Sequence, residues 1–356
     1  MKRWASLVLL LTAMVVLTSC GGNPAASGNT KSSQPSSAKT LRLHANGTPN
    51  LTGLQISMGN SAGSTHLGDT NVYDMLQYLH KWGATVSPIN NLHGTGAELG
   101  VLSGGLSYCT SQYSTEVDAG LTVFGPSMAH VDYVLLVNPA IHSIRQLKGK
   151  PFAISNSVSP DAILLSAALR KVGLKPSDLQ VTYTGGDDED LNELIAGKVD
   201  GAFVPSASLL TTGTRFKVLA TGRSVAPSFA DSFVASSPSW LRSHPATAEA
   251  VDLAWLAAAK EFDTQPQQWV KAAEIYTGNA NSVSYVEATY KSLKTINAWP
   301  ISSAAIFSQA VVKANQQFSR TQGDIQGLGN RPMAQLATMT PWNAAFSLFQ
   351  AHESAY

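Results

Sequence analysis

The chain has 356 residues, of which 44% are hydrophobic and 13% are charged, and its formal net charge is +1. This length suits one large or two ordinary domains, and the low charge excludes coiled coils and long solvated charge runs. The near-neutral balance argues against a nucleic-acid-binding protein, whose affinity rests on a basic field. Two cysteines are too few for a disulfide framework or a multi-cysteine zinc module.

The N-terminus predicts export and a lipid anchor. Lys2 and Arg3 precede an apolar run over residues 4–17, which is too short to cross a bilayer core of ~30 Å and has the length of a signal-peptide core. The run ends in Leu-Thr-Ser before Cys20, which resembles a bacterial lipobox, where the cysteine is lipidated after cleavage. We therefore expect a signal peptide over residues 1–19 and a lipid-anchored, extracytoplasmic protein. The alternative is an ordinary signal peptide with a chance cysteine.

The next segment, residues 20–52, is expected to hold the lipidated cysteine, a flexible tether and a lead-in. Residues 21–39 are mostly Gly, Asn, Ser, Pro and Ala, without a large apolar side chain, so they cannot bury a core. Beyond them Cys109 is the only cysteine, which excludes an intramolecular disulfide in the folded part.

From about residue 53 onward, short apolar segments alternate with helical ones. Strands are predicted over residues 54–58, 84–89, 106–110, 131–138, 151–155, 179–183 and 199–204, with helices over 71–82, 96–102, 160–172 and 187–196. This alternation predicts α/β units with right-handed crossovers and mainly parallel sheets. A further strand is predicted over 229–235, followed by helices over 247–262, 265–275, 284–296 and 302–318.

Two segments of the chain repeat one pattern. Residues 102–109 align with residues 195–202, and in both a helix ends near a glycine that a short apolar strand follows at once. Glycine accepts the left-handed conformation that ends many helices. The repeat suggests two lobes of related construction.

Four segments, taken in order, resemble the solute-binding proteins of ABC transporters. They are SIRQLKGKPFAI over 143–154, ILLSAALRKVGL over 163–174, AGKVDGAF over 196–203 and FVASSPSWLRSHP over 233–245. The resemblance covers about residues 117–278 and is nearest to the aliphatic-sulfonate, taurine and nitrate type, which includes pyrimidine-precursor binders.

This resemblance implies a type II periplasmic-binding-protein fold with two lobes, each a mainly parallel sheet flanked by helices, and two crossovers. Lobe 1 would span residues 53–130 and 228–356, and lobe 2 residues 131–227. The protein would capture a small polar organic solute, sulfonate-, nitrate- or pyrimidine-like, between its closing lobes and dock on the membrane permease subunits of an ABC importer. We expect a monomer that needs no cofactor, metal or nucleic acid.

A solute site is expected beyond the carboxyl ends of the strands, where backbone N–H groups and helix N-termini converge. This rule selects a set of polar loop residues: Asn60, Ser61, Ser64, Thr65, Asn90, Ser111, Gln112, Tyr113, Ser157, Ser159, Asp187 and Ser206. Their hydroxyl and amide groups suit hydrogen bonding to a small solute. Each one alone is more simply explained by local capping or turn formation.

Four consecutive acidic residues, 187–190, open one predicted helix. They can hold a cationic ligand or a metal, or they can simply compensate the helix dipole, which is the interpretation we favour. No arginine falls in the selected loops, which weakens a sulfonate assignment, although neutral donors at helix ends can also hold an anion.

The segment Gly-Asn-Ser-Ala-Gly over 59–63 matches a nucleophile elbow and raises a serine hydrolase using Ser61 as an alternative function. In α/β hydrolases that serine follows several strands, whereas here it follows the first, and nothing marks His244 or His352 as its base. We therefore expect a binding protein and no enzyme. A ligand-sensing lipoprotein for a signalling partner is a further alternative that the sequence does not separate from transport.

Overall fold

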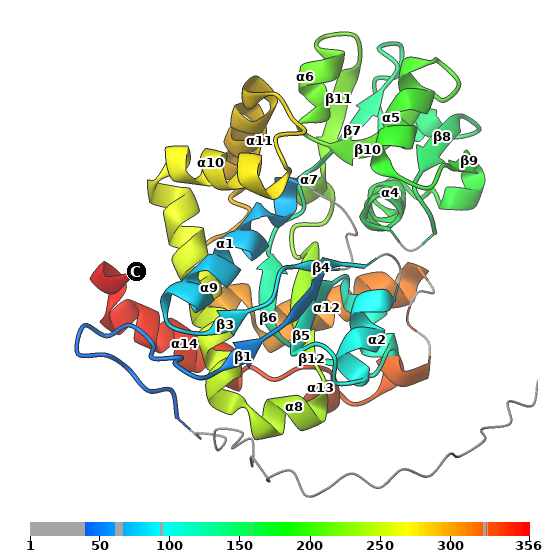
Figure 1. The fold of residues 1–356 in the computed structure, drawn as a ribbon. Helices are drawn as coiled ribbons and strands as arrows, with labels where there is room; N and C mark the ends of the chain where they lie inside the picture. Colours follow the sequence, from blue (N-terminus) through cyan, green and yellow to red (C-terminus); the bar gives the residue numbers. More distant parts are fainter. Residues whose placement is uncertain (1–39, 61–66, 93–94, 158, 323–324, 326) are drawn as a thin grey trace, which may run out of the picture. The chain divides into compact units, whose positions relative to one another are not determined.

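The computed structural model describes residues 40–60, 67–92, 95–157, 159–322, 325 and 327–356. Two five-stranded sheets organise these residues, and a small parallel sheet pairs β1 (Gln55–Ile56) with β3 (Thr85–Val86) (Figure 1). None of the helices in the described part combines the length and the apolar character needed to cross a membrane.

The first sheet has one reversed strand. Its order is β4 (Asn90–Asn91), β2 (Met58–Asn60), β5 (Tyr108–Ser111), β12 (Ser232–Ser236) and β6 (Thr122–Met128). Strand β12 runs antiparallel to both neighbours, and the other strands share one direction.

The second sheet repeats this plan. Its order is β11 (Lys217–Thr221), β7 (Tyr133–Val137), β10 (Gly201–Pro205), β8 (Pro151–Ile154) and β9 (Gln180–Tyr183), and here β7 is the reversed strand. The predicted α/β class with two mainly parallel sheets is confirmed. We use "first lobe" and "second lobe" for each sheet with the helices packed on it.

The two strand orders correspond place by place. From the β6 edge the first sheet reads β6-β12-β5-β2-β4, and from the β11 edge the second reads β11-β7-β10-β8-β9. Strands β5 and β10, which come from the repeated sequence pattern, hold the same place. The glycines of the repeat, Gly104 and Gly197, both take left-handed conformations, with φ of 79° and 70°. In each sheet, the reversed strand is the first strand that the chain forms after it crosses over from the other lobe.

The helices divide between the two lobes. Those of the second lobe are α4 (Pro160–Arg170), α5 (Asp187–Ile195), α6 (Ser208–Thr212) and α7 (Gly222–Val225). The others are α1 (Thr70–Lys81), α2 (Gly96–Leu102), α3 (Tyr113–Asp118), α8 (Pro238–Ser243), α9 (Pro245–Thr264), α10 (Pro266–Tyr276), α11 (Val283–Ile296), α12 (Gln309–Gln322), α13 (Met333–Leu336) and α14 (Thr340–Ala351). Short 3₁₀ turns cover Leu67–Asp69, Ile144–Leu147, Pro176–Asp178, Ala304–Ile306, Gly327–Asn330 and Glu353–Ala355.

Helix α9 forms the centre of the first-lobe core. It is rich in alanine and apolar around nearly its whole circumference, so it is buried between other elements instead of facing water on one side. Trp255 on α9 packs edge-on against Trp342 of α14, with ring centroids 5.5 Å apart. Cys109 is fully buried in the same core and is not part of a disulfide.

The second sheet is covered on both faces. Alternate residues of β7 enter two separate cores: Leu135 and Val137 pack with α4, and Val134 and Leu136 pack with α5. Figure 1 shows α4 and α5 flanking the strands of this sheet. Burial on both faces explains why β7 reads as an uninterrupted apolar run.

Several elements differ from the sequence prediction. The strand predicted over 54–58 breaks at Ser57, whose N–H donates to the Ser107 hydroxyl 3.1 Å away, so β1 and β2 join different sheets. The helix predicted over 302–318 begins only at Gln309, because Ser303 caps a separate 3₁₀ turn through the Ala305 N–H. Strands β6 and β11 and helices α3, α6 and α14 were not predicted.

Candidate functional site

The carboxyl end of the first sheet is built around Asn60. This side chain is 2% exposed, accepts a hydrogen bond from the Thr110 hydroxyl at 3.2 Å and donates to Asp69 Oδ2 at 3.0 Å. It also donates to the Tyr276 hydroxyl at 3.5 Å. Asn60 therefore ties β2 to β5, to the start of α1 and to the end of α10, which fixes the frame of this edge.

The side chains that follow β5 are more buried than their predicted place in a solvent-exposed loop suggests. Ser111 is 5% exposed at the end of the strand, and Gln112 is half-buried at the N-cap position of α3. Tyr113 is 3% exposed and its ring stacks edge-on against Phe233 at 5.7 Å between centroids, inside the first-lobe core. Asn90 is exposed in β4 and donates to the Met58 carbonyl at 3.2 Å.

In the second lobe, the loop after β8 presents Ser157 to solvent. Ser159, 5% exposed, closes this turn by donating to the Asn156 carbonyl at 2.9 Å and accepting from the Asn156 N–H at 3.2 Å. Pro160 follows as the first residue of α4, where its missing N–H costs nothing. Ser159 thus shapes the loop that carries Ser157.

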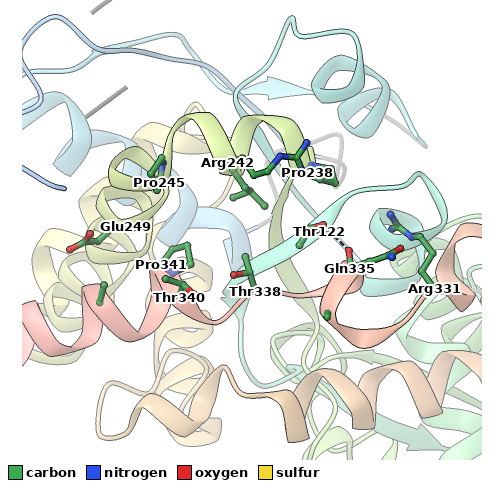
Figure 2. Close-up of a pocket in the computed structure, with 13 residues that line it drawn as sticks. Thr122, Pro238, Arg242, Pro245, Glu249, Arg331, Gln335, Thr338, Thr340 and Pro341 are labelled. Carbon is green, nitrogen blue, oxygen red and sulfur yellow. Dashed lines mark hydrogen bonds between the residues drawn. The ribbon is translucent and has the colours of Figure 1, made fainter. Parts of the chain in front are cut away.

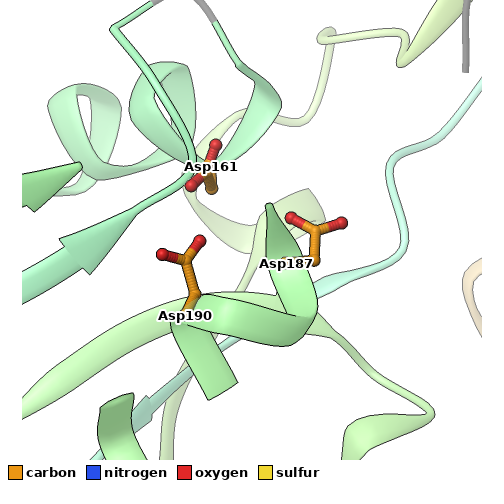
Figure 3. Close-up of side chains that lie close together, drawn as sticks. All are labelled: Asp161, Asp187 and Asp190. Atoms are coloured by element: carbon orange, nitrogen blue, oxygen red, sulfur yellow. The ribbon is translucent and has the colours of Figure 1, made fainter. Parts of the chain in front are cut away.

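Asp187 lies in a cluster of three carboxyl groups. It is half-buried at the start of α5, and Asp190 of the same helix and Asp161 of α4 are both fully buried beside it. One carboxyl oxygen of each lies within 4.8 Å of the others (Figure 3). The Tyr133 hydroxyl donates to Asp187 Oδ2 at 2.7 Å, from the start of β7.

Hydroxyl groups hold the buried carboxyls of this cluster. Thr184 donates to Asp190 Oδ1 at 2.6 Å, and Ser155 Oγ lies 3.0 Å from Asp190 Oδ2 and 3.2 Å from Asp187 Oδ1. Burial, together with the neighbouring Asp161 carboxylate, raises the pKa of Asp190 to about 8. Burial also raises the pKa of Asp161. Like charges this close favour a shared proton over full ionisation.

Sequence reasoning missed Asp161, and it considered Asp190 only as one member of the acidic run 187–190. Asp190 stands three residues after Asp187 and so lies on the same face of a helix. Asp161 follows the Ser-Pro pair that begins α4, which points it toward the same edge of the sheet. Both signals were present in the sequence, although neither separates a ligand contact from helix-dipole compensation.

Ser206 joins the two lobes. Its hydroxyl contacts Asp132 Oδ1 and the hydroxyl of Ser292, and Ser292 also donates to Asp132 Oδ1 at 3.2 Å. Ser206 and Asp132 flank the second sheet, whereas Ser292 belongs to α11, whose Val286 and Leu293 lie in the first-lobe core. The contact therefore bridges the lobes. Ser61, Ser64, Thr65 and Cys20 lie outside the described residues.

A cavity of about 640 Å³ lies elsewhere, on the first lobe (Figure 2). Helices α8, α9, α13 and α14 surround it together with the start of β6, where Thr122 donates to the Gln335 carbonyl. At the edge of the cavity, the Arg331 guanidinium donates hydrogen bonds to the backbone carbonyls of Val117, Gly120 and Leu121. These bonds hold its charge against the protein backbone. All the lining residues that the structure describes belong to the first lobe, away from the carboxyl ends of the second sheet.

Comparison with known proteins gives one family match over part of the chain. Residues 121–275 match the model of the family described as ABC transporter, phosphonate, periplasmic substrate-binding protein. No curated protein sequence matches the chain.

Solved structures share the fold at low sequence identity. The putative periplasmic sulfonate-binding protein of Methylobacillus flagellatus KT is 15% identical with a TM-score of 0.66, and the match covers 85% of this chain and 96% of that one. The alkanesulfonate-binding protein of Xanthomonas axonopodis pv. citri, bound to MOPS, is 18% identical with a TM-score of 0.60, over 81% and 99%. A zinc-bound ligand-binding component of an ABC-type import system from Staphylococcus aureus is 12% identical with a TM-score of 0.62, over 82% and 99%.

The matched range contains all four of the sequence segments that resemble solute-binding proteins, so the family match agrees with that resemblance. The family model matches less than half of the chain, and the solved structures show that the chain shares the fold of these periplasmic sulfonate-binding proteins.

Proposed function

We propose that this protein captures a small polar solute between its two lobes and delivers it to a membrane permease. One observation carries the proposal: two sheets of matched strand order are joined by two chain crossings, from β6 to β7 and from α7 to β12. Such a pair of lobes can close about its crossings, and the solute stabilises the closed state by binding it more tightly.

The division into lobe 1 (53–130 and 228–356) and lobe 2 (131–227) is part of this proposal. The solute would lie at the carboxyl ends of the strands. Asn90, Gln112, Ser157 and Asp187 keep exposed or half-exposed side chains for it, while Asn60, Ser159 and Ser206 hold the surrounding frame. Ser61, Ser64 and Thr65, which lie outside the described residues, remain predicted contacts of the solute.

The family match and the similar structures both indicate a chemical class for the solute. The matched family is described by phosphonates and two of the similar structures by sulfonates, which makes these anions the first candidates.

We further propose that Cys20 carries the lipid anchor, that the protein acts as a monomer, and that it is a receptor without catalysis. Mass spectrometry of the mature N-terminus would identify a diacylglyceryl cysteine, and an unmodified N-terminus upstream of Cys20 would rule the anchor out. Labelling of Ser61 by a fluorophosphonate probe would favour the hydrolase instead.

Small-angle scattering tests lobe closure. We expect the radius of gyration to fall when a bound solute is added, and we expect Ser157→Trp to weaken binding by about tenfold or more because the indole occupies the proposed site. The matched control is Ser177→Trp. Ser177 is equally exposed but precedes β9, at the opposite edge of the same parallel strands, and should leave binding unchanged. Equal binding by both variants would contradict the proposed site.

A further inference from the structure

We propose that the first lobe carries a second binding site, apart from the proposed solute site between the lobes, for a small zwitterion with its two charges at opposite ends. Short peptides and ω-amino acids share this chemistry. The site is the cavity of about 640 Å³ shown in Figure 2, and the lining residues that the structure describes all belong to the first lobe. The inference does not depend on the proposed function, because it concerns a different place on the molecule.

The cavity has the size and the walls of a small-molecule site. Its volume lies within the range of about 300–1,000 Å³ that is usual for such sites. Leu241 and three proline rings supply an apolar wall: Pro238 and Pro245 begin α8 and α9, and Pro341 is the second residue of α14. Prolines fit at helix starts, where the missing N–H costs nothing. An apolar wall with a few polar groups is typical of sites for small organic molecules.

Glu249 of α9 brings a carboxyl group to one end of this lining (Figure 2). The side chain is half-buried and makes no hydrogen bond or ion pair with any residue that the structure describes. Burial raises the pKa of this carboxyl group, because the charged form loses hydration. An ammonium group brought by a ligand would offset that cost.

The helix dipole does not explain Glu249. The favourable effect of an acidic residue on the dipole is confined to the first turn, and the first turn of α9 contains no acidic residue. The nearby carboxyl group of Asp252 on the same helix is fully buried; burial raises its pKa, and Glu249 adds to the rise. The surroundings of Glu249 therefore include a like charge, which makes a cationic group from a ligand more favourable.

Two arginines line the same cavity. In Figure 2, Arg331 lies at the end opposite Glu249, and Arg242 of α8 lies between them. The guanidinium of Arg331 is held in place by the carbonyl bonds described above. That of Arg242 is exposed and forms no hydrogen bond, ion pair or ring contact within the described part of the chain. A free guanidinium beside a fixed one suits a carboxylate, which accepts two parallel hydrogen bonds from arginine.

The charges of the cavity do not neutralise each other. The ion pairs among the described residues are Lys150–Asp200, Lys198–Glu193 and Lys294–Asp263, so neither arginine is paired with Glu249. Threonine hydroxyls and the prolines line the space between the two signs of charge. A ligand with an ammonium at one end, a carboxylate at the other and an apolar or amide body matches this order better than an anion or a cation alone.

The test compares ligands that differ in one charge at a time. The purified full-length protein is titrated by calorimetry with alanyl-leucine and with 6-aminohexanoate. The comparison ligands are N-acetyl-alanyl-leucine and hexanoate, which lack the cation, and alanyl-leucine amide and hexylamine, which lack the anion.

We expect at least one of the two zwitterions to bind, and its singly charged relatives to bind about tenfold or more weakly. Glu249→Gln should weaken the zwitterion by a similar factor and remove the preference over the ligand without a cation. Arg242→Gln should remove the preference over the ligand without an anion. A merely structural role of either side chain would leave these preferences unchanged.

The matched controls lie outside the cavity. Glu274→Gln changes a half-buried carboxyl on α10, and Arg170→Gln changes an exposed guanidinium at the end of α4; both should bind as the unmodified protein does. Thermal unfolding without ligand shows that every variant is folded.

Three outcomes overturn the inference, and each leaves the proposed function standing. Hexanoate or hexylamine that binds as tightly as 6-aminohexanoate would refute a site for zwitterions. Binding that Ser157→Trp weakens and Glu249→Gln does not would place the ligand between the lobes. Absence of binding by both zwitterions would refute the second site itself.

Discussion

Asp190 is a carboxyl group whose surroundings oppose its ionisation. Asp161 of α4 and Asp187 of its own helix face it as possible like charges, and Tyr133 of β7 reaches Asp187 from the adjoining strand. Among the described residues, the Thr184 and Ser155 hydroxyls offset this by donating to it. A proton on Asp190 or Asp161 therefore stabilises the ligand-free protein.

This gives a stability that depends on pH. With a folded-state pKa of about 8 for Asp190, above the value near 4 of an unfolded carboxyl, the folded protein holds a proton that the unfolded chain releases. Stability should fall as pH rises from about 5 to 8, by up to about 1.4 kcal/mol per pH unit from this group.

Thermal unfolding at a series of pH values tests this sign. Asp190→Asn, which imitates the protonated state, should flatten the decline, whereas the exposed Glu189→Gln should keep it. An Asp190→Asn profile as steep as that of the unmodified protein would show that the proton resides elsewhere.

At the scale of the elements, β6 illustrates why some strands could not be predicted from the sequence. Its sequence Thr-Val-Phe-Gly-Pro-Ser-Met contains a Gly-Pro pair that normally breaks a strand, and it was not predicted. Strand β6 lies at the edge of its sheet, where Pro126 need not donate to a further strand, and its register with β12 shifts between Pro126 and Met128. By contrast, β7 and α4 were predictable because continuous burial and a Ser-Pro start are local features.

Gly125 in β6 has a packing role that can be measured. A Cβ there would lie 1.9 Å from Asp252 Oδ1, in a fully buried contact with α9. Gly125→Ala should therefore reduce the free energy of unfolding by about 1–3 kcal/mol, as overpacking does. Denaturant unfolding measures the loss.

Two further variants isolate the cause. Asp252→Ala removes the opposing oxygen, so the double variant with Gly125→Ala should lose less than the sum of the single losses. Gly53 has open space around its Cβ position, and Gly53→Ala reports the cost of its positive φ alone. Additive losses at residues 125 and 252 would exclude the proposed overlap.

Across the whole molecule, α11 holds the lobes together. It is anchored in the first-lobe core, yet Ser292 contacts Asp132 and Ser206, and the Ile296 carbonyl accepts from Arg223 of α7 at 2.8 Å. The positive charge of Arg223 at the C-terminal end of α11 also favours this arrangement.

Removing these bonds should loosen the lobes. For the double variant Ser292→Ala and Arg223→Ala we expect a larger radius of gyration without ligand. Thr295→Ala is the matched control, because its exposed hydroxyl bonds only within α11, to the Lys291 carbonyl. An unchanged radius of gyration in the double variant would show that other contacts set the lobe angle.

At this scale the sequence was most informative about the fold and least about the site. The glycine pattern at Gly104 and Gly197 is local, and it predicts two lobes of related construction. The carboxyl cluster needs residues 161, 187 and 190 to meet in space, and the sequence gives only that each one starts or follows a helix. Burial of Asn60 and Tyr113 could not be read from their loop positions either.

The burial of Cys109 makes lobe motion convenient to measure. Burial raises the pKa of its thiol, and Glu116 and Glu98 raise it further, so little reactive thiolate forms at neutral pH. With Cys20 acylated or replaced, one cysteine introduced on each lobe would supply the only two reactive thiols. Paired spin labels or fluorophores could then report the opening angle of single molecules while candidate solutes are exchanged around them.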